Sequence, residues 1–188
     1  MGNTASNVSA GKPKATGAIW VAPLGTILPE DTATELDSAY ACLGYCSDDG
    51  LTNSTNLESE TIKAWGGDTV LSIQTSKEDT FQYKLIEVLN VDVLKFVYGS
   101  GNVTGDLTSG IKLTANNQDV EERVVVIDMI MRDNTAKRVV IPSCKITKIG
   151  DIVYSDSEAV GYEITVACTP DAEGNTHYEY IRKSVVSA

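Results

Sequence analysis

Two strand-like segments joined by a pair of glycines constrain this chain more than any other feature. Residues 58–65 and 69–76 flank Gly66-Gly67, and in the following segment, 77–85, the large apolar residues Phe81, Tyr83 and Leu85 occupy alternate positions. Alternation with period two is typical of a strand with one buried face. Consecutive glycines supply the positive φ angles of a tight hairpin turn. The sequence therefore predicts an antiparallel β-hairpin in the middle of the chain.

One short helix is expected after this hairpin. Asn90 is a suitable N-cap, Asp92 suits the positive start of a helix, and Gly99 is a natural stop. Between them the apolar residues recur at helical spacing. These features predict a helix over residues 90–98.

The remaining chain consists of short strand patterns separated by turn residues. The segments with such patterns are 18–22, 42–46, 111–115, 123–132, 137–142, 144–149 and 160–168. Many short antiparallel strands with one helix predict a mainly β fold, either an antiparallel β-sandwich or a partly open barrel, with extended arms.

The pattern of apolar and polar residues divides the chain into one domain and two arms. Residues 1–17 have no hydrophobic period and are expected to form a flexible N-terminal arm. The β domain is expected over 18–169, with a polar loop and hairpin at 47–67. Residues 170–188, which open with turn residues, are expected to form a C-terminal arm.

Composition and charge exclude several classes of function. The 188 residues are 42% hydrophobic, enough to bury a sizeable core, and no apolar run is long enough for a membrane helix. The polar start does not resemble a signal peptide, so folding in a cytoplasm is expected. The net charge of −11 disfavours ordinary nucleic-acid binding, because such a surface repels phosphate.

The four cysteines leave three interpretations open. Buried free thiols are favoured because Cys144 and Cys168 fall inside apolar strand patterns. A disulfide is the second interpretation. A zinc site is the third and the least supported, because the spacing of Cys42 and Cys46 is unsuitable and His177 is the only histidine. We expect no cofactor and no metal.

The central hairpin and the end of the chain resemble the major tail tube proteins of long-tailed, non-contractile bacteriophages. The first block of similarity is carried by Ile62, Lys63, Ala64, Trp65, Gly66, Gly67, Gln74, Thr75, Ser76, Thr80, Phe81, Leu85, Ile86, Glu87, Leu94, Val97, Tyr98 and Gly99. The second is carried by residues 161–165, 170–171 and 174–181. Together the two blocks bracket most of the chain.

This resemblance implies a structural subunit of the virion tail, assembled in the host cytoplasm. It implies self-association into stacked rings, usually of six copies, that enclose the tape-measure protein and conduct DNA without binding it specifically. The tail terminator and distal tail proteins are its other implied partners, and no membrane is involved. The alternative is the inner-tube subunit of a contractile injection system. A monomeric ligand-binding β-sandwich, from a different functional class, is less favoured.

Candidate site residues follow from this interpretation. Trp65, beside the predicted turn, either packs in the core or anchors a subunit contact, since aromatic residues dominate interface energetics. Tyr178 and Tyr180 in the C-terminal arm are further contact candidates. A tube that conducts DNA needs neutral or acidic walls, so Glu58, Glu60 and Glu78 are candidates to line the lumen. We expect no catalytic residue and no enzymatic activity, with His177 as a packing residue.

Overall fold

One antiparallel sheet makes up most of the molecule. The structure is a computed structural model, and it describes residues 2–183. Strand order along the sheet is β3-β2-β8-β9-β10-β5-β4, with β1 paired to β8 and β11 paired to β9. The bounds are β1 Lys12–Pro13, β2 Ile19–Pro23, β3 Ala41–Cys42, β4 Cys46–Lys63, β5 Thr69–Leu85, β8 Arg123–Ile130, β9 Thr135–Ile149, β10 Tyr162–Cys168 and β11 Tyr178–Lys183.

Smaller elements complete the chain. A two-stranded sheet pairs β6 (Val103–Thr104) with β7 (Lys112–Leu113). The described residues include three short 3₁₀ helices: η1 (Ala5–Asn7) before β1, η2 (Ser100–Asn102) between α1 and β6, and η3 (Arg132–Asn134) between β8 and β9. The one α-helix among residues 2–183, α1 (Val91–Tyr98), confirms the helix predicted over 90–98. The amide of Asp92 donates to the Asn90 side chain at 3.0 Å, so Asn90 is the N-cap as expected.

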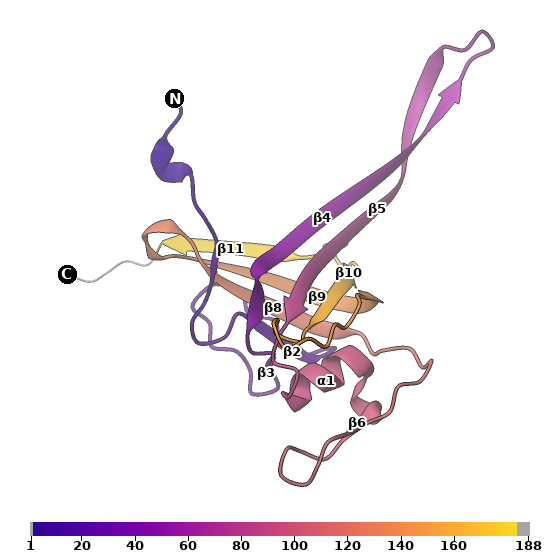
Figure 1. Cartoon of the computed structure of the whole chain (residues 1–188). Helices are drawn as coiled ribbons and strands as arrows, with labels where there is room; N and C mark the ends of the chain where they lie inside the picture. Colours follow the sequence, from indigo (N-terminus) through magenta and orange to yellow (C-terminus); the bar gives the residue numbers. More distant parts are fainter. Residues whose placement is uncertain (1, 184–188) are drawn as a thin grey trace.

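The sheet curls around one main core. Phe81 and Leu85 of β5 belong to the same hydrophobic cluster as Ile127 of β8, although β9 and β10 lie between these two strands in the sheet. Four buried residues of α1 join the same cluster, and the helix lies below the sheet in Figure 1. The edge strands β3 and β4 do not pair with each other. The fold is therefore a mainly antiparallel, partly open β structure with one short helix, as predicted.

The opposite face of the central strands carries a second core. Val124, Val126 and Val140 pack there with Ala22 and Tyr40. Both faces of β8 and β9 are thus covered, which is why apolar residues occupy both alternating sets of positions in these strands.

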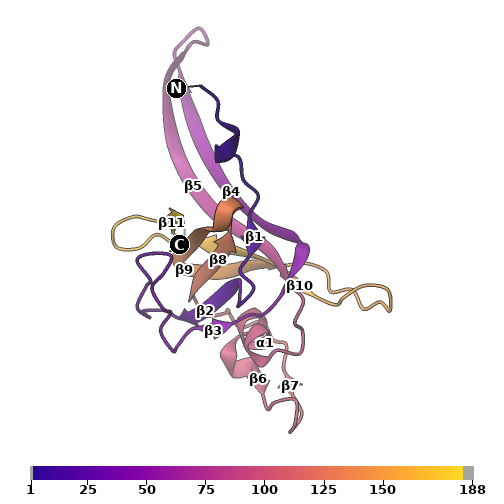
Figure 2. The same ribbon diagram turned by 90° about the vertical axis from the view of Figure 1, so that its left-hand side faces the viewer.

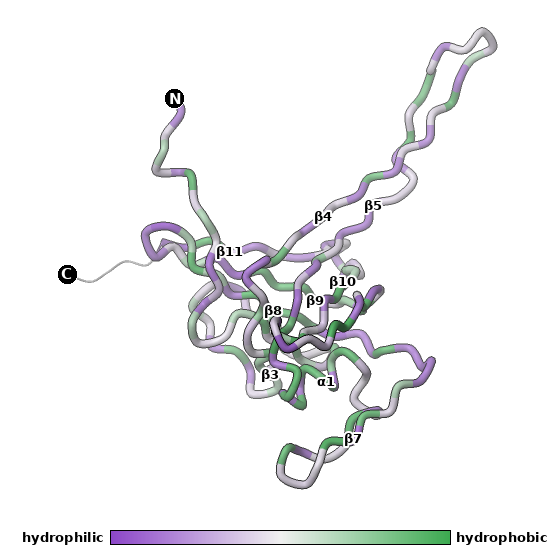
Figure 3. Tube along the Cα trace, viewed as in Figure 1, coloured by the Kyte–Doolittle hydropathy of each residue, from purple (hydrophilic) through white to green (hydrophobic). Residues whose placement is uncertain are grey.

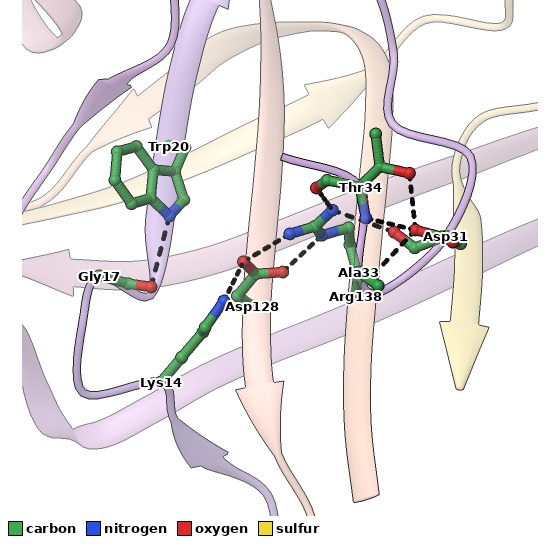
Figure 4. A network of polar contacts seen from close by, with 8 residues as sticks. All are labelled: Lys14, Gly17, Trp20, Asp31, Ala33, Thr34, Asp128 and Arg138. Carbon is green, nitrogen blue, oxygen red and sulfur yellow. Dashed lines mark hydrogen bonds and ion pairs between the residues drawn. The ribbon is translucent and has the colours of Figure 1, made fainter. Parts of the chain in front are cut away.

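A buried ion pair fastens the chain over this second face. The Arg138 guanidinium donates to both carboxylate oxygens of Asp128, from Nε at 2.7 Å and from Nη2 at 2.9 Å. Its remaining nitrogen donates to the carbonyls of Asp31 and Thr34 at 3.0 and 2.7 Å, and Lys14 Nζ lies 3.6 Å from Asp128 (Figure 4). The Arg138 guanidinium therefore holds the loop between β2 and β3 to the sheet. Asp128 holds the N-terminal segment to the sheet through Lys14.

One segment of the sheet differs from the sequence-based expectation. Residues 47–57 were expected to form a turn and polar loop, but they belong to β4, which pairs with β5 along its length. The Ser47–Gly50 turn residues instead form a bulge, in which Gly50 adopts a φ of +79°. The backbone hydrogen bonds between paired strands do not require apolar side chains. A polar segment such as this one can therefore form a strand that its composition does not predict.

The two predicted arms are partly tied to the sheet. Lys12–Pro13 pairs with β8, and the backbone amide of Arg132 donates to Ser9 Oγ at 2.7 Å. Residues 178–183 form β11 along β9 and do not extend away as an arm. The reason is that β9 is long enough for β10 and β11 to pair with different parts of the same edge.

Candidate assembly surface: the projecting hairpin

The hairpin predicted around Gly66-Gly67 is confirmed. Its tip is closed by hydrogen bonds from the Ala64 amide to the Asp68 carbonyl at 2.7 Å and from the Gly67 amide to the Ala64 carbonyl at 3.0 Å. Gly66 and Gly67 have φ angles of +119° and +100°, which side chains other than glycine rarely allow. The turn requires both glycines, and this requirement explains their presence.

Beyond the body of the protein the hairpin stands alone. Figures 1 and 2 show β4 and β5 running out as a two-stranded ribbon, well clear of the rest of the sheet. Every residue from 52 to 78 is exposed. An isolated two-stranded hairpin is marginally stable at best in water. A ribbon of this length that has no covering layer in the monomer is therefore a candidate surface for contacts between subunits.

The register assigns the predicted acidic residues to one face of this ribbon. Asn56 pairs with Glu78, Glu58 with Ser76 and Glu60 with Ile73. Because residues two apart on β4 share a face, Glu58, Glu60 and Glu78 all lie on the same side. Ser76 Oγ donates to the Glu58 carboxylate at 3.0 Å. The structure thus brings the three lumen candidates together, and their facing the lumen remains a prediction.

Toward the tip the same face becomes apolar. Ile62 pairs with Leu71, and Ile73 lies two residues from Leu71, so these side chains form an exposed patch. In Figure 3 the ribbon is mostly hydrophilic, with hydrophobic segments near its end. Trp65, at the tip, has a relative exposure of 107%. Of the two interpretations of Trp65, core packing within the monomer is therefore wrong.

A buried carboxylate fixes the point where the ribbon leaves the body. Asp79 is only 1% exposed and accepts hydrogen bonds from Asn53, Thr55 and Thr176 at 3.1, 2.9 and 2.8 Å. Its Oδ2 also lies 2.7 Å from Nδ1 of His177. Burial alone raises the pKa of Asp79, but these hydrogen bonds and the His177 charge outweigh it, so the pKa lies below 3.8. Asp79 joins the ribbon to the segment before β11.

Sequence reasoning missed Asp79, although a signal was present. The alternation that places Phe81, Tyr83 and Leu85 on the core side of β5 also places residue 79 there. A carboxylate on the buried face of a strand requires hydrogen-bond partners. Their identity was not accessible from the sequence, because Thr176 and His177 are nearly a hundred residues away.

The other predicted contact residues lie in the body, far from Trp65. Tyr178 and Tyr180 are half-buried and pack against the second core through β11. Tyr178 Oη donates to Asp171 at 2.5 Å and thereby closes the turn before β11. Their role in subunit contacts stays a prediction. The His177 ring meets Phe81 edge-on at 5.3 Å, the packing role expected for it.

The cysteines are free thiols. Cys144 is buried, and Cys42, Cys46 and Cys168 are half-buried. Burial raises the pKa of the Cys144 thiol far above its usual value of 9.0, that of Cys168 to about 12 and that of Cys46 to about 11. These groups stay protonated at neutral pH, so of the three interpretations the structure agrees with buried free thiols.

Within residues 2–183, no cluster of three or more histidine, cysteine, aspartate or glutamate side chains is arranged to hold a metal ion. In the same part of the chain, no helix has the length and apolar character needed to cross a membrane.

The described residues form a curled antiparallel sheet from which a fully exposed edge hairpin projects. Residues 3–188 match the family described as phage tail tube protein. This chain therefore belongs to the phage tail tube protein family, and it is a tail component, as the sequence resemblance predicts.

Two solved structures are similar to this chain at low sequence identity. One chain of the sheath–tube complex of the extracellular contractile injection system PVC, in the extended state, shares 7% identity at a TM-score of 0.42. That match covers 89% of this chain and 90% of the other. The tube-terminating cap of the anti-feeding prophage shares 9% identity at a TM-score of 0.42, covering 95% and 98%. No curated protein matches the sequence.

Proposed function

We propose that this protein forms stacked rings, of six copies each, that enclose the tape-measure protein and later conduct DNA. The observation that carries the proposal is the ribbon of residues 52–78, which is exposed on both faces. An uncovered edge strand is a liability for a protein that remains a monomer, because its free backbone groups pair with other chains. A subunit that joins a ring turns this liability into a contact.

The chemistry of the described residues suits a structural role. The largest buried polar groups, Asp79 and the Asp128–Arg138 pair, are fully engaged in contacts that hold loops to the sheet. Nothing in these networks is directed at a bound substrate. We infer that the protein has no enzymatic activity, and that its partners are copies of itself, the tape-measure protein, the tail terminator and the distal tail proteins.

The charge of the chain suits a conduit for DNA. Duplex DNA carries one negative charge per ~1.7 Å of axis, so even weak attraction would accumulate along many rings into a large barrier. The net charge of −11 and the shared face of Glu58, Glu60 and Glu78 favour a wall that repels phosphate.

Assembly is tested by electron microscopy and light scattering of the purified protein over a range of concentrations. We expect rings or tubes to form and to lengthen as the concentration rises. A protein that stays monomeric at all concentrations, including with tape-measure protein present, would exclude the tube function and favour a monomeric carrier.

Conduction is tested separately in virions that carry Glu58→Lys and Glu60→Lys. Both side chains are exposed and neither forms an ion pair among the described residues, so folding should be unaffected. We expect slower genome ejection at low salt and recovery at moderate salt, since salt screens the added attraction. Normal ejection from well-formed particles would remove both residues from the lumen wall.

A further inference from the structure

An apolar groove lies where the curled sheet remains open, between β1 and the first residues of β4. Ile19, Ile127 and Met129 form its floor, Leu51 forms a wall, and its volume is about 470 Å³. Ile19 and Ile127 are core residues, whereas Leu51 and Met129 are only partly buried. The groove therefore borders the main core, and only its partly buried members, Leu51 and Met129, reach solvent.

Two opposite charges stand on opposite rims of this groove. Lys12 comes from β1 and Asp48 from the bulge of β4. Both side chains are exposed. Among residues 2–183 neither has an ion-pair partner. Such a groove suits an apolar side chain that is flanked by one basic and one acidic residue, each facing the rim of opposite charge.

The tip of the hairpin has this arrangement. Trp65 projects fully into solvent, with Lys63 on the β4 side and Asp68 on the β5 side. The adjoining glycines leave open space around them, since a Cβ built on either would meet no atom within 4 Å. The tip is thus a slender apolar knob flanked by one charge of each sign.

We propose that Trp65 of one subunit inserts into the groove of a second copy of this chain. Lys63 of the knob then faces the Asp48 rim, and Asp68 faces the Lys12 rim. The proposal rests on the proposed assembly into a tube and identifies the surface that receives the hairpin. The indole supplies most of the affinity, while the exposed charges fix the orientation.

The knob cannot reach the groove of its own chain. Lys63 and Asp48 lie near opposite ends of β4, and fifteen residues of strand span roughly 50 Å at about 3.3 Å per residue. Figure 1 shows the tip pointing away from the body. Each subunit therefore offers a knob and a groove to different neighbours. Such a head-to-tail contact propagates into rings or columns.

Disulfide trapping tests this contact while leaving Trp65 in place. In the full chain carrying Lys63→Cys and Asp48→Cys, a disulfide between the new thiols can form only between chains, because it requires Cα atoms within about 7 Å. Mild oxidation should give a ladder of cross-linked multimers. Lys63→Cys with Glu158→Cys, an exposed residue outside the groove, is the matched control. Lys63→Cys alone measures cross-linking to the natural Cys46, which also lines the groove.

The expected yield of the ladder is about tenfold above both controls, and adding Trp65→Ala should reduce it about tenfold. Normal tubes without this excess would overturn the docking and leave the tube function standing. Ladders without tubes would support the docking and reject the tube function.

Charge reversal provides a second measurement that does not depend on oxidation. Lys12→Glu places two acidic groups opposite each other and should raise the concentration needed for assembly several-fold. Adding Asp68→Lys should restore it. Failure of the second substitution to rescue the first, in folded protein, would rule out the proposed orientation.

Discussion

The central strands and the projecting ribbon use the same antiparallel ladder with opposite surroundings. β8 and β9 are covered on both faces by two cores, and their valines and isoleucines are almost entirely buried. The outer parts of β4 and β5 are covered on neither face. The central strands pair with neighbours along both edges, whereas the outer parts of β4 and β5 pair only with each other. The difference teaches that the ladder defines the shape of this protein, whereas burial decides which part is stable alone and which part needs a neighbour.

The largest loss of stability is expected when the buried ion pair of the central strands is broken. Arg138→Ala should reduce the free energy of unfolding by about 3–5 kcal/mol, because it leaves the buried Asp128 carboxylate without its guanidinium partner and with only Lys14 nearby, at 3.6 Å. Denaturant titration of the monomer measures this loss. Asp128→Asn combined with Arg138→Met should cost much less, since no buried charge remains. Equal losses in the single and double variants would show that the charge is not the cause.

A core substitution on β9 should produce the next largest effect. Ile141 is fully buried, and Ile141→Ala should cost about 2–5 kcal/mol through lost burial and a residual cavity. Ile73→Ala on the ribbon, which also replaces a strand isoleucine, is the matched control and should change the monomer by less than about 0.5 kcal/mol. Comparable losses at the two sites would mean that the ribbon is covered in the monomer.

The junction between the two regions should respond to pH. The pKa of Asp79 in the folded protein lies below 3.8, so the unfolded chain binds a proton more readily than the folded one. Its contribution is therefore complete above the unfolded pKa and is lost as the pH falls through the lower folded value. Asp79→Asn should reduce the change in stability between pH 5 and pH 2, as measured by thermal unfolding. An unchanged pH profile would exclude Asp79 as a source of acid sensitivity.

Replacing Trp65 should have the smallest effect on the stability of the monomer and the largest effect on assembly. Trp65→Ala should leave the free energy of unfolding within about 0.5 kcal/mol of the natural protein, because the side chain makes no contact to lose. Tube formation should fail or require much higher concentration. Circular dichroism and electron microscopy of the same sample separate the two. Normal tubes from this variant would show that the tip is not an assembly element.

Hydrogen exchange tests, without any substitution, whether the ribbon forms subunit contacts. Backbone amides near the tip of the ribbon should exchange quickly in the monomer and slowly in the tube, while those of β8 and β9 stay protected in both. Equal protection of the ribbon before and after assembly would argue against its role in subunit contacts.

The sequence by itself determined the local elements of this protein. Short apolar or alternating patterns located β2, β5, β8 and β10, and the two patterns expected at 137–142 and 144–149 fall within the single strand β9. Two glycines located the hairpin turn, and Asn90 with Gly99 delimited the helix. These features depend on neighbours a few residues apart, so the chain states them directly. The family resemblance extended the prediction to a tail tube fold, which the family match confirms.

Only the tertiary structure decided where these elements meet. The polar half of β4 is a strand because β5 lies beside it, and residues 178–183 are a strand because the long edge of β9 has room for them. The partners of Asp79 and Arg138, and the groove between β1 and β4, join residues that are remote in the chain. Such contacts follow from how the sheet curls, a property of all strands together that no local pattern encodes.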